Sequence, residues 1–154
     1  MSLKRIGLTS LMVALVVASS ACDNSGSDTT PTPTVVPVNE VLTGTVQIPV
    51  NGTLQSAFNT FVVGQGGGTV SVTLTSAVET LPGGTLLTTV TMGLGIGTVT
   101  NGTCTPFSNA FVTAQASSTP QLTGGLNAGS YCVQVSDVTS QVGPVAYALA
   151  VSHP

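Results

Sequence analysis

The sequence carries very little charge. Only 5% of its 154 residues are charged, and the two basic ones, Lys4 and Arg5, stand near the start. Soluble domains usually contain about 25% charged residues. Because no Lys or Arg follows Arg5, a domain formed by the rest of the chain cannot neutralise phosphates, which excludes nucleic-acid binding.

Aromatic residues and histidine are also scarce. Tryptophan is absent, aromatics make up 4% of the chain, and His153 is the only histidine. A catalytic histidine needs a nucleophile and an orienting partner, and a zinc site needs several nitrogen or sulfur ligands. We therefore expect His153 to be a surface residue, and we predict neither a cofactor nor a metal centre of this kind.

The first 21 residues have the layout of an export signal. Lys4 and Arg5 precede an apolar run at 6–18, and small residues follow up to Ala21, which is the order of a signal peptide. The apolar run is too short for a comfortable membrane-spanning helix, which needs about 20 residues.

The small residues before Cys22 resemble the lipobox of bacterial lipoproteins. The resemblance implies a cut after Ala21 and acylation of Cys22, which would anchor the chain in a lipid bilayer. Ser19 departs from the pattern, because the family most often has leucine there. The pair Ser19 and Ala21 also suits ordinary signal peptidase, which would release a soluble protein, and an uncleaved anchor is a third interpretation.

Three cysteines are an odd number, and an unpaired thiol in an oxidising compartment is a liability. Acylation of Cys22 leaves Cys104 and Cys132 as a pair. We therefore predict a disulfide bond between Cys104 and Cys132.

The composition divides the exported part into two regions. Residues 22–41 are dominated by Ser, Thr, Gly and Pro, which is typical of a flexible or polyproline-like tether. Residues 42–154 form the predicted domain, in which apolar and polar residues alternate as they do in half-buried strands. The clearest runs are 46–50, 70–74, 90–96, 130–136 and 145–151, with weaker ones at 57–63, 109–115 and 119–123.

Turn signals separate these runs, and no stretch shows sustained helical spacing. The signals are Asn51-Gly52, 66–68, 82–84, Asn101-Gly102, Gly124-Gly125 and Gly143-Pro144. About eight short strands separated by turns predict an all-β fold, an antiparallel β-sandwich of the jelly-roll kind.

The segment 126–137, with its Ala-Gly-Ser-Tyr entry into a strand, and the final Tyr-x-Leu-x-Val run at 147–151 resemble bacterial pre-peptidase C-terminal (PPC) domains. The order of the upstream runs 61–63 and 68–74 is similar to that family as well. The resemblance covers roughly 44–152 and implies a jelly-roll-like sandwich appended to secreted peptidases and other exported proteins. Some members bind extracellular polymers and some are stabilised by calcium. No peptidase precedes the domain here, so we expect no in-chain catalyst for it to assist.

The acids of the predicted domain are few. Of the acidic cluster that calcium-binding members of the family use, this sequence retains little more than Glu40. Asp137 is a further candidate calcium ligand, and no other metal ligand is expected. For Asp137, which follows a strand, we favour a turn residue that accepts backbone N–H bonds. Nothing in the sequence pairs Glu79 with a second acid for glycosidase-type chemistry.

Two further motifs have structural explanations. The sequons that begin at Asn51 and Asn101 also read as Asn-Gly hairpin turns, which we favour over glycosylation. Tyr131 and Tyr147 could form a sugar-stacking platform, but both are in phase with apolar strand residues, so we expect them in the core.

These observations predict a non-enzymatic binding or adhesion module, exported and anchored at the bacterial cell envelope. A protein or a neutral glycan is the expected partner. The alternative is a structural or assembly lipoprotein of the envelope, and a hydrolase is the third interpretation.

Overall fold

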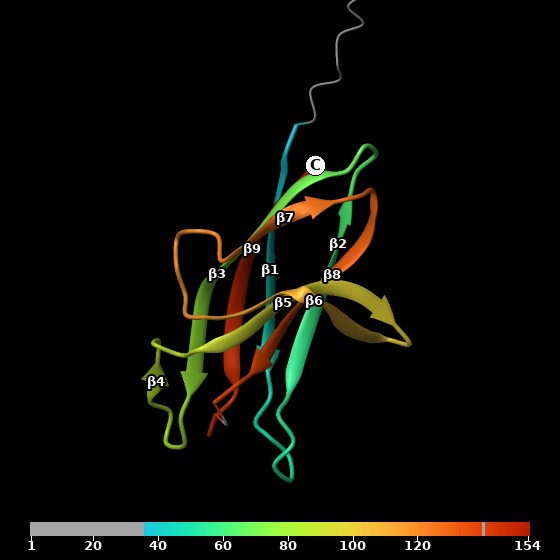
Figure 1. The fold of residues 1–154 in the computed structure, drawn as a ribbon. Coiled ribbons are helices and arrows are strands. Elements are labelled where there is room, and N and C mark those ends of the chain that lie inside the picture. Colours follow the sequence, from blue (N-terminus) through green and yellow to red (C-terminus); the bar gives the residue numbers. More distant parts are fainter. Residues whose placement is uncertain (1–35, 140) are drawn as a thin grey trace, which may run out of the picture. The chain divides into compact units, whose positions relative to one another are not determined.

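The structure is a computed structural model that describes residues 36–139 and 141–154. The signal segment, Cys22 and most of the predicted tether lie outside the described residues, so their predictions are not tested by it. The described chain forms nine β-strands (Figure 1). They are β1 (Val38–Val46), β2 (Ser56–Val63), β3 (Gly68–Thr80), β4 (Leu86–Leu87), β5 (Met92–Thr100), β6 (Thr103–Ala114), β7 (Leu122–Leu126), β8 (Gly129–Asp137) and β9 (Val145–His153).

The strands form two antiparallel sheets, which we call sheet 1 and sheet 2. Sheet 1 has the order β1-β9-β3, and both β7 and the short β4 pair with the free side of β3, at opposite ends. Sheet 2 has the order β2-β8-β5-β6. Apart from β4, the order β1-β9-β3-β7 facing β2-β8-β5-β6 is that of a jelly roll, which confirms the predicted all-β sandwich.

The core lies between the two sheets and follows from period-two alternation. Along the strands, every second residue points inward, where it is removed from water, and the residues between point outward. The alternation is interrupted by register shifts at Leu74/Ser76 of β3 and at Gly95/Gly97 of β5. The inward residues include Val145, Tyr147, Leu149 and Val151 of β9, Val133 and Val135 of β8, and Met92, Leu94 and Ile96 of β5. In the described part of the chain, no helix is long and apolar enough to cross a membrane.

The first strand differs from the prediction. β1 starts at Val38, inside the segment assigned to the tether, and ends at Val46, whereas Ile48 and Val50 are exposed beyond it. Pro49 has no N–H to offer a sheet, and Asn51 and Gly52 form a turn with φ of 52° and 77°. The alternating run 46–50 therefore contains the end of β1 and the residues that lead to the turn, and it does not form a strand of its own.

Candidate functional site

Two buried carboxylates hold the connection between β8 and β9. Glu79 is 4% exposed, and its Oε1 accepts hydrogen bonds from the backbone N–H groups of Val142 and Gly143 at 2.8 and 2.9 Å. Asp137 is 2% exposed and accepts from the N–H groups of Thr139 and Gln141 at 2.9 and 3.1 Å. The prediction that Asp137 binds turn amides is confirmed, and both carboxylates serve to order backbone.

His153 is not a surface residue, so that prediction was wrong. It is 3% exposed, its ring lies 5.5 Å from that of Phe61, and its Nε2 is 2.9 Å from Oε1 of Glu40. The reason is the alternation of β9, which continues past Val151 and directs His153 inward. Glu40, a candidate calcium ligand, is thus paired with His153. Among the described residues, no three His, Cys, Asp or Glu side chains lie where they could hold a metal ion.

Tyr147 lies in the core, as predicted, whereas Tyr131 is only partly buried and packs against the core. Tyr147 is buried, and its hydroxyl donates to Oδ1 of Asn59 at 2.8 Å. Burial raises the pKa of the Tyr147 phenol above its ordinary value of 10.0. Tyr131 is half-buried between the rings of Phe61 and Phe107, at centroid distances of 5.9 and 6.3 Å. The ring of Tyr147 is therefore not presented as a platform for a sugar.

The Cys104–Cys132 disulfide is present, which confirms the predicted pair. Cys104 lies on β6 and Cys132 on β8, and β5 runs between these two strands. Gly97 of β5 has to be glycine, because a Cβ there would overlap the carbonyl oxygen of Thr105 on β6. The bond therefore ties together two strands of sheet 2 that are not neighbours.

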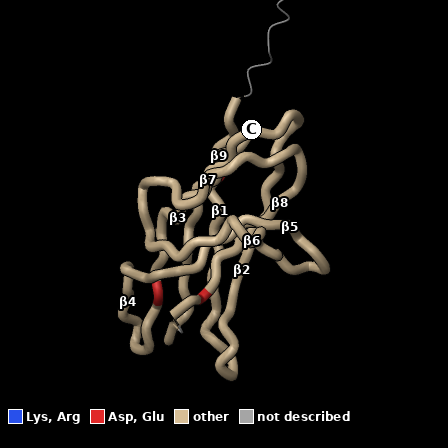
Figure 2. Tube along the Cα trace, viewed as in Figure 1, with Lys and Arg blue, Asp and Glu red and all other residues tan. Residues whose placement is uncertain are grey.

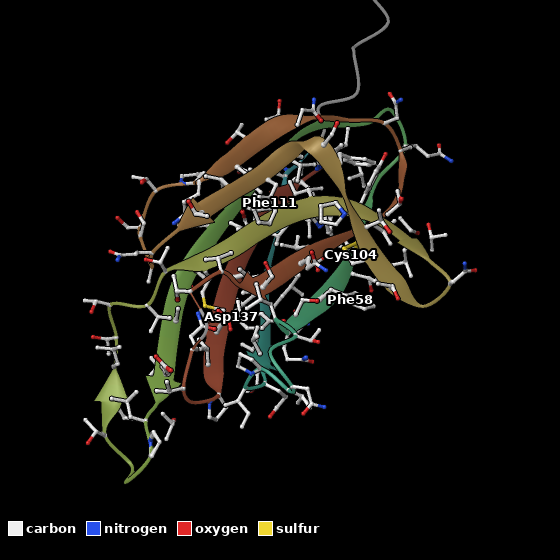
Figure 3. All side chains as sticks on the ribbon, turned by 60° about the horizontal axis from the view of Figure 1, so that its bottom comes forward. Phe58, Cys104, Phe111 and Asp137 are labelled. Carbon is white, nitrogen blue, oxygen red and sulfur yellow. A yellow bond between two sulfur atoms is a disulfide. The ribbon has the colours of Figure 1, made fainter. Side chains whose placement is uncertain are left out.

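The outer face of sheet 2 carries exposed aromatic residues. The strand register places Phe58, Gln134, Gly95 and Phe111 in one row across β2, β8, β5 and β6 (Figure 3). Phe58 is 37% and Phe111 47% exposed. A Cβ at Gly93 or Gly95 would lie only 2.7 or 3.1 Å from the Phe111 ring, so this ring covers these two glycines of β5. Such coverage stabilises glycine-containing strands and gives Phe111 a structural role.

A groove opens at one edge of the sandwich, between β6 of sheet 2 and β7 of sheet 1. We call it the β6–β7 groove; it encloses about 260 Å³. Its lining consists of Ile96, Phe107, Asn109, Ala110, Leu122, Thr123, Gly124, Gly125 and Leu126. No residue of this lining is charged. At the opposite edge β1 and β2 approach each other, and Nδ2 of Asn59 donates to the carbonyl of Thr43 at 3.2 Å.

The groove owes its shape to an irregularity in β6. Gly95 pairs with Phe111 and Gly97 with Pro106, so residues 107–110 stand opposite Ile96 alone. This bulge supplies one wall of the groove, and β7 supplies the other. Bulges of this kind re-aim side chains and are frequent at sheet edges and beside functional sites.

The sequence did not predict the groove. The sequence predicts a turn at Gly124-Gly125, but the structure places both glycines inside β7. The sequence does contain a feature that distinguishes this strand from a turn. Gly124 and Gly125 lie between Leu122 and Leu126, and neither glycine is next to the Asn or Pro that often accompanies a turn. Glycine inside a strand often marks a close approach of a ligand or another backbone.

A scan against protein-family models, a search of curated proteins and a search of solved structures found no match to this chain.

Proposed function

We propose that this chain is a non-catalytic binding module that contacts a protein or a neutral glycan. It would be exported to the bacterial cell envelope and held there by an acylated Cys22, with residues 22–41 as the tether. The observation that carries the binding role is the β6–β7 groove, an open, uncharged concavity at a sheet edge.

The chemistry of the side chains supports binding over catalysis. Catalytic sites combine a nucleophile and base, an acid and base pair, or a metal. Glu79 and Asp137 are occupied by backbone amides, and His153 is buried against Phe61 with Glu40 beside it. None of these groups faces the β6–β7 groove, because none belongs to its lining.

The distribution of charge supports an uncharged partner. Figure 2 shows acidic residues only at isolated points of the described trace, and no basic residue along it. Without cations the surface cannot attract anionic polymers, and without an acidic cluster it does not select cationic ones. A protein segment or a neutral glycan is the partner that remains.

The test is a binding measurement with the immobilised full chain. Proteins and neutral polysaccharides extracted from bacterial envelopes are applied separately, at low and at high salt. We expect saturable retention of one class, little affected by salt because few charges are available to be screened. Release of soluble products from a polymer by the chain, or retention that high salt abolishes, would contradict the proposal.

A structural or assembly role is the second candidate, and the outer face of sheet 1 favours it. Ala146, Ala148 and Ala150 of β9 form a row of small side chains on this face. Small side chains of this kind allow another sheet to approach closely. Ala146→Lys would block such packing and leave the β6–β7 groove intact, so an envelope defect with this variant alone would favour the assembly role.

A further inference from the structure

We propose that the β6–β7 groove binds an extended, uncharged peptide segment of a partner protein, which adds as a strand to the free edge of β7. The inference rests on the proposed function and selects the protein over the glycan. It also names the residue, Gly124, that admits the partner's side chain.

The glycines of β7 have no explanation within the fold. Neither Gly124 nor Gly125 has a positive φ, and a Cβ added to either would meet no heavy atom within 4 Å. Glycine in a strand interior lowers stability relative to residues with a side chain, because it loses more backbone freedom on folding. By contrast, Gly93, Gly95 and Gly97 each leave room for a neighbouring residue. The open space above β7 is what a close-lying backbone would need.

The edge of β7 is free to pair. Among the described residues, β7 pairs with β3 alone, so its other side offers backbone N–H and C=O groups without a strand partner. Proteins usually protect such edges with charged residues, proline or bulges. Residues 122–126 contain neither a charge nor a proline. Strand addition at an unprotected edge is an established mode of peptide recognition.

The two glycines face in opposite directions. Gly124 pairs with the fully buried Val70, and Gly125 pairs with the exposed Thr69. Paired residues of neighbouring strands point to the same face of a sheet. Gly124 therefore faces the interior of the groove, whereas Gly125 faces the outer surface of sheet 1.

This arrangement defines what the added strand must carry. Leu122 and Leu126 are partly buried on either side of Gly124, and Ile96, Phe107 and Ala110 line the groove. An apolar side chain of the partner, opposite Gly124, would fill the space between the two leucines. No charge in the lining could compensate a buried partner charge, which would be costly. The partner segment is therefore apolar at alternate positions and uncharged where it lies in the groove.

The same lining disfavours a sugar. Stacking on a pyranose needs an accessible aromatic face, and the one aromatic residue of the lining, Phe107, is half-buried. The polar side chains of the lining are limited to Asn109 and Thr123. Backbone groups of β7 provide the regularly spaced partners, and these match another backbone better than a ring of hydroxyls.

The test uses a displayed library of random nine-residue peptides, selected on the immobilised full chain. We expect enrichment of uncharged peptides with alternating apolar residues. Gly124→Val should weaken their binding by at least about tenfold, the change that loss of one well-packed contact produces. Ala146→Val is the control: it enlarges an exposed side chain on the outer face of sheet 1, outside the groove lining, and should leave binding unchanged. Gly124→Val should not melt below the wild type, since a Cβ at this site meets no heavy atom within 4 Å.

Backbone pairing is tested on the peptide itself. Methylating the amide nitrogens that point toward β7 should abolish binding, whereas methylating the intervening ones should not, because only alternate amides of an edge strand pair with one neighbour. Equal effects of both sets would overturn strand addition.

Three other results would also overturn the inference. The first is a selection in which no peptide binds the wild type more tightly than it binds Gly124→Val. The second is binding of neutral oligosaccharides that Gly124→Val abolishes, and the third is self-association that the same variant abolishes. Saturable envelope binding that Gly124→Val leaves intact would refute this site but leave the proposed function standing. Polymer hydrolysis would remove the proposed function itself.

Discussion

Glu79 is the residue on which the β8–β9 connection depends most directly. One carboxylate oxygen accepts two backbone N–H groups in a buried setting. Replacing Glu79 with alanine leaves both donors without a partner, and we expect a loss of about 2–4 kcal/mol in the free energy of unfolding. Glu79→Gln keeps an amide oxygen as acceptor and should lose clearly less. Urea denaturation of both variants measures the difference, and equal losses would contradict the assigned role.

Tyr147 gives the folded state a dependence on alkaline pH. Burial raises the pKa of its phenol above 10.0, so the unfolded chain releases this proton at a lower pH than the folded chain does. The contribution of Tyr147 to stability is therefore fully present below pH 10.0 and is lost as the pH rises through the folded pKa.

The urea midpoint should accordingly fall as the pH rises above about 10. Tyr147→Phe should flatten this fall. It should also lower stability by about 1 kcal/mol at neutral pH, since the bond to Asn59 is lost. Tyr131→Phe leaves Tyr147 in place and should keep the alkaline fall. A wild-type midpoint that does not respond to alkaline pH would contradict the account.

For single residues, the alternation of inward and outward side chains along a strand predicted burial better than the polarity of the side chain did. Tyr147 was placed in the core by its phase with Leu149 and Val151, which the structure confirms. His153 has the same phase, yet its polarity and its place in the sequence led to a surface assignment. Its burial depends on Phe61 and Glu40, which come from other strands, and such long-range partners are not visible in the local sequence.

Among the elements, β5 and its neighbours depend on the Cys104–Cys132 bond. The bond spans a sequence separation of 28 residues. In the chain-entropy description, closing a loop of this size stabilises the fold by about 3–4 kcal/mol. Replacing both cysteines with serine should lower the free energy of unfolding by roughly this amount, measured by urea denaturation. The double variant should match the reduced wild type, and a fully stable double variant would contradict the prediction.

The sequence located most strands because their apolar residues alternate, as in β3, β5, β8 and β9. It failed at two edges of sheet 1. β1 begins among residues that read as tether, and β7 contains glycines that read as a turn. In both cases pairing with a partner strand, β9 or β3, decides the conformation, and strand pairing between distant residues overrides local preference.

For the whole molecule, anchoring remains a prediction from the sequence, because Cys22 lies outside the described residues. Cys22→Ser should leave the precursor uncleaved and abolish its membrane fractionation, since the acylated residue is lost. Ser25→Ala, a change in the tether, should be processed like the wild type. Immunoblots of membrane and soluble fractions measure both. Normal processing and secretion of Cys22→Ser would instead favour ordinary signal peptidase and a cut after Ala21.

The position of the disulfide has a consequence for the dynamics of the whole domain. β7 lies entirely inside the covalent loop 104–132, although it belongs to the other sheet. When β7 separates from β3, both of its ends therefore remain within the loop that the disulfide closes. The separated strand can reach few extended conformations, so it re-forms its pairing with β3 quickly. Amide exchange in β7 should then proceed by brief local openings and not by global unfolding. An arriving strand would meet an edge that is already ordered, and preorganisation of this kind lowers the entropy lost on association.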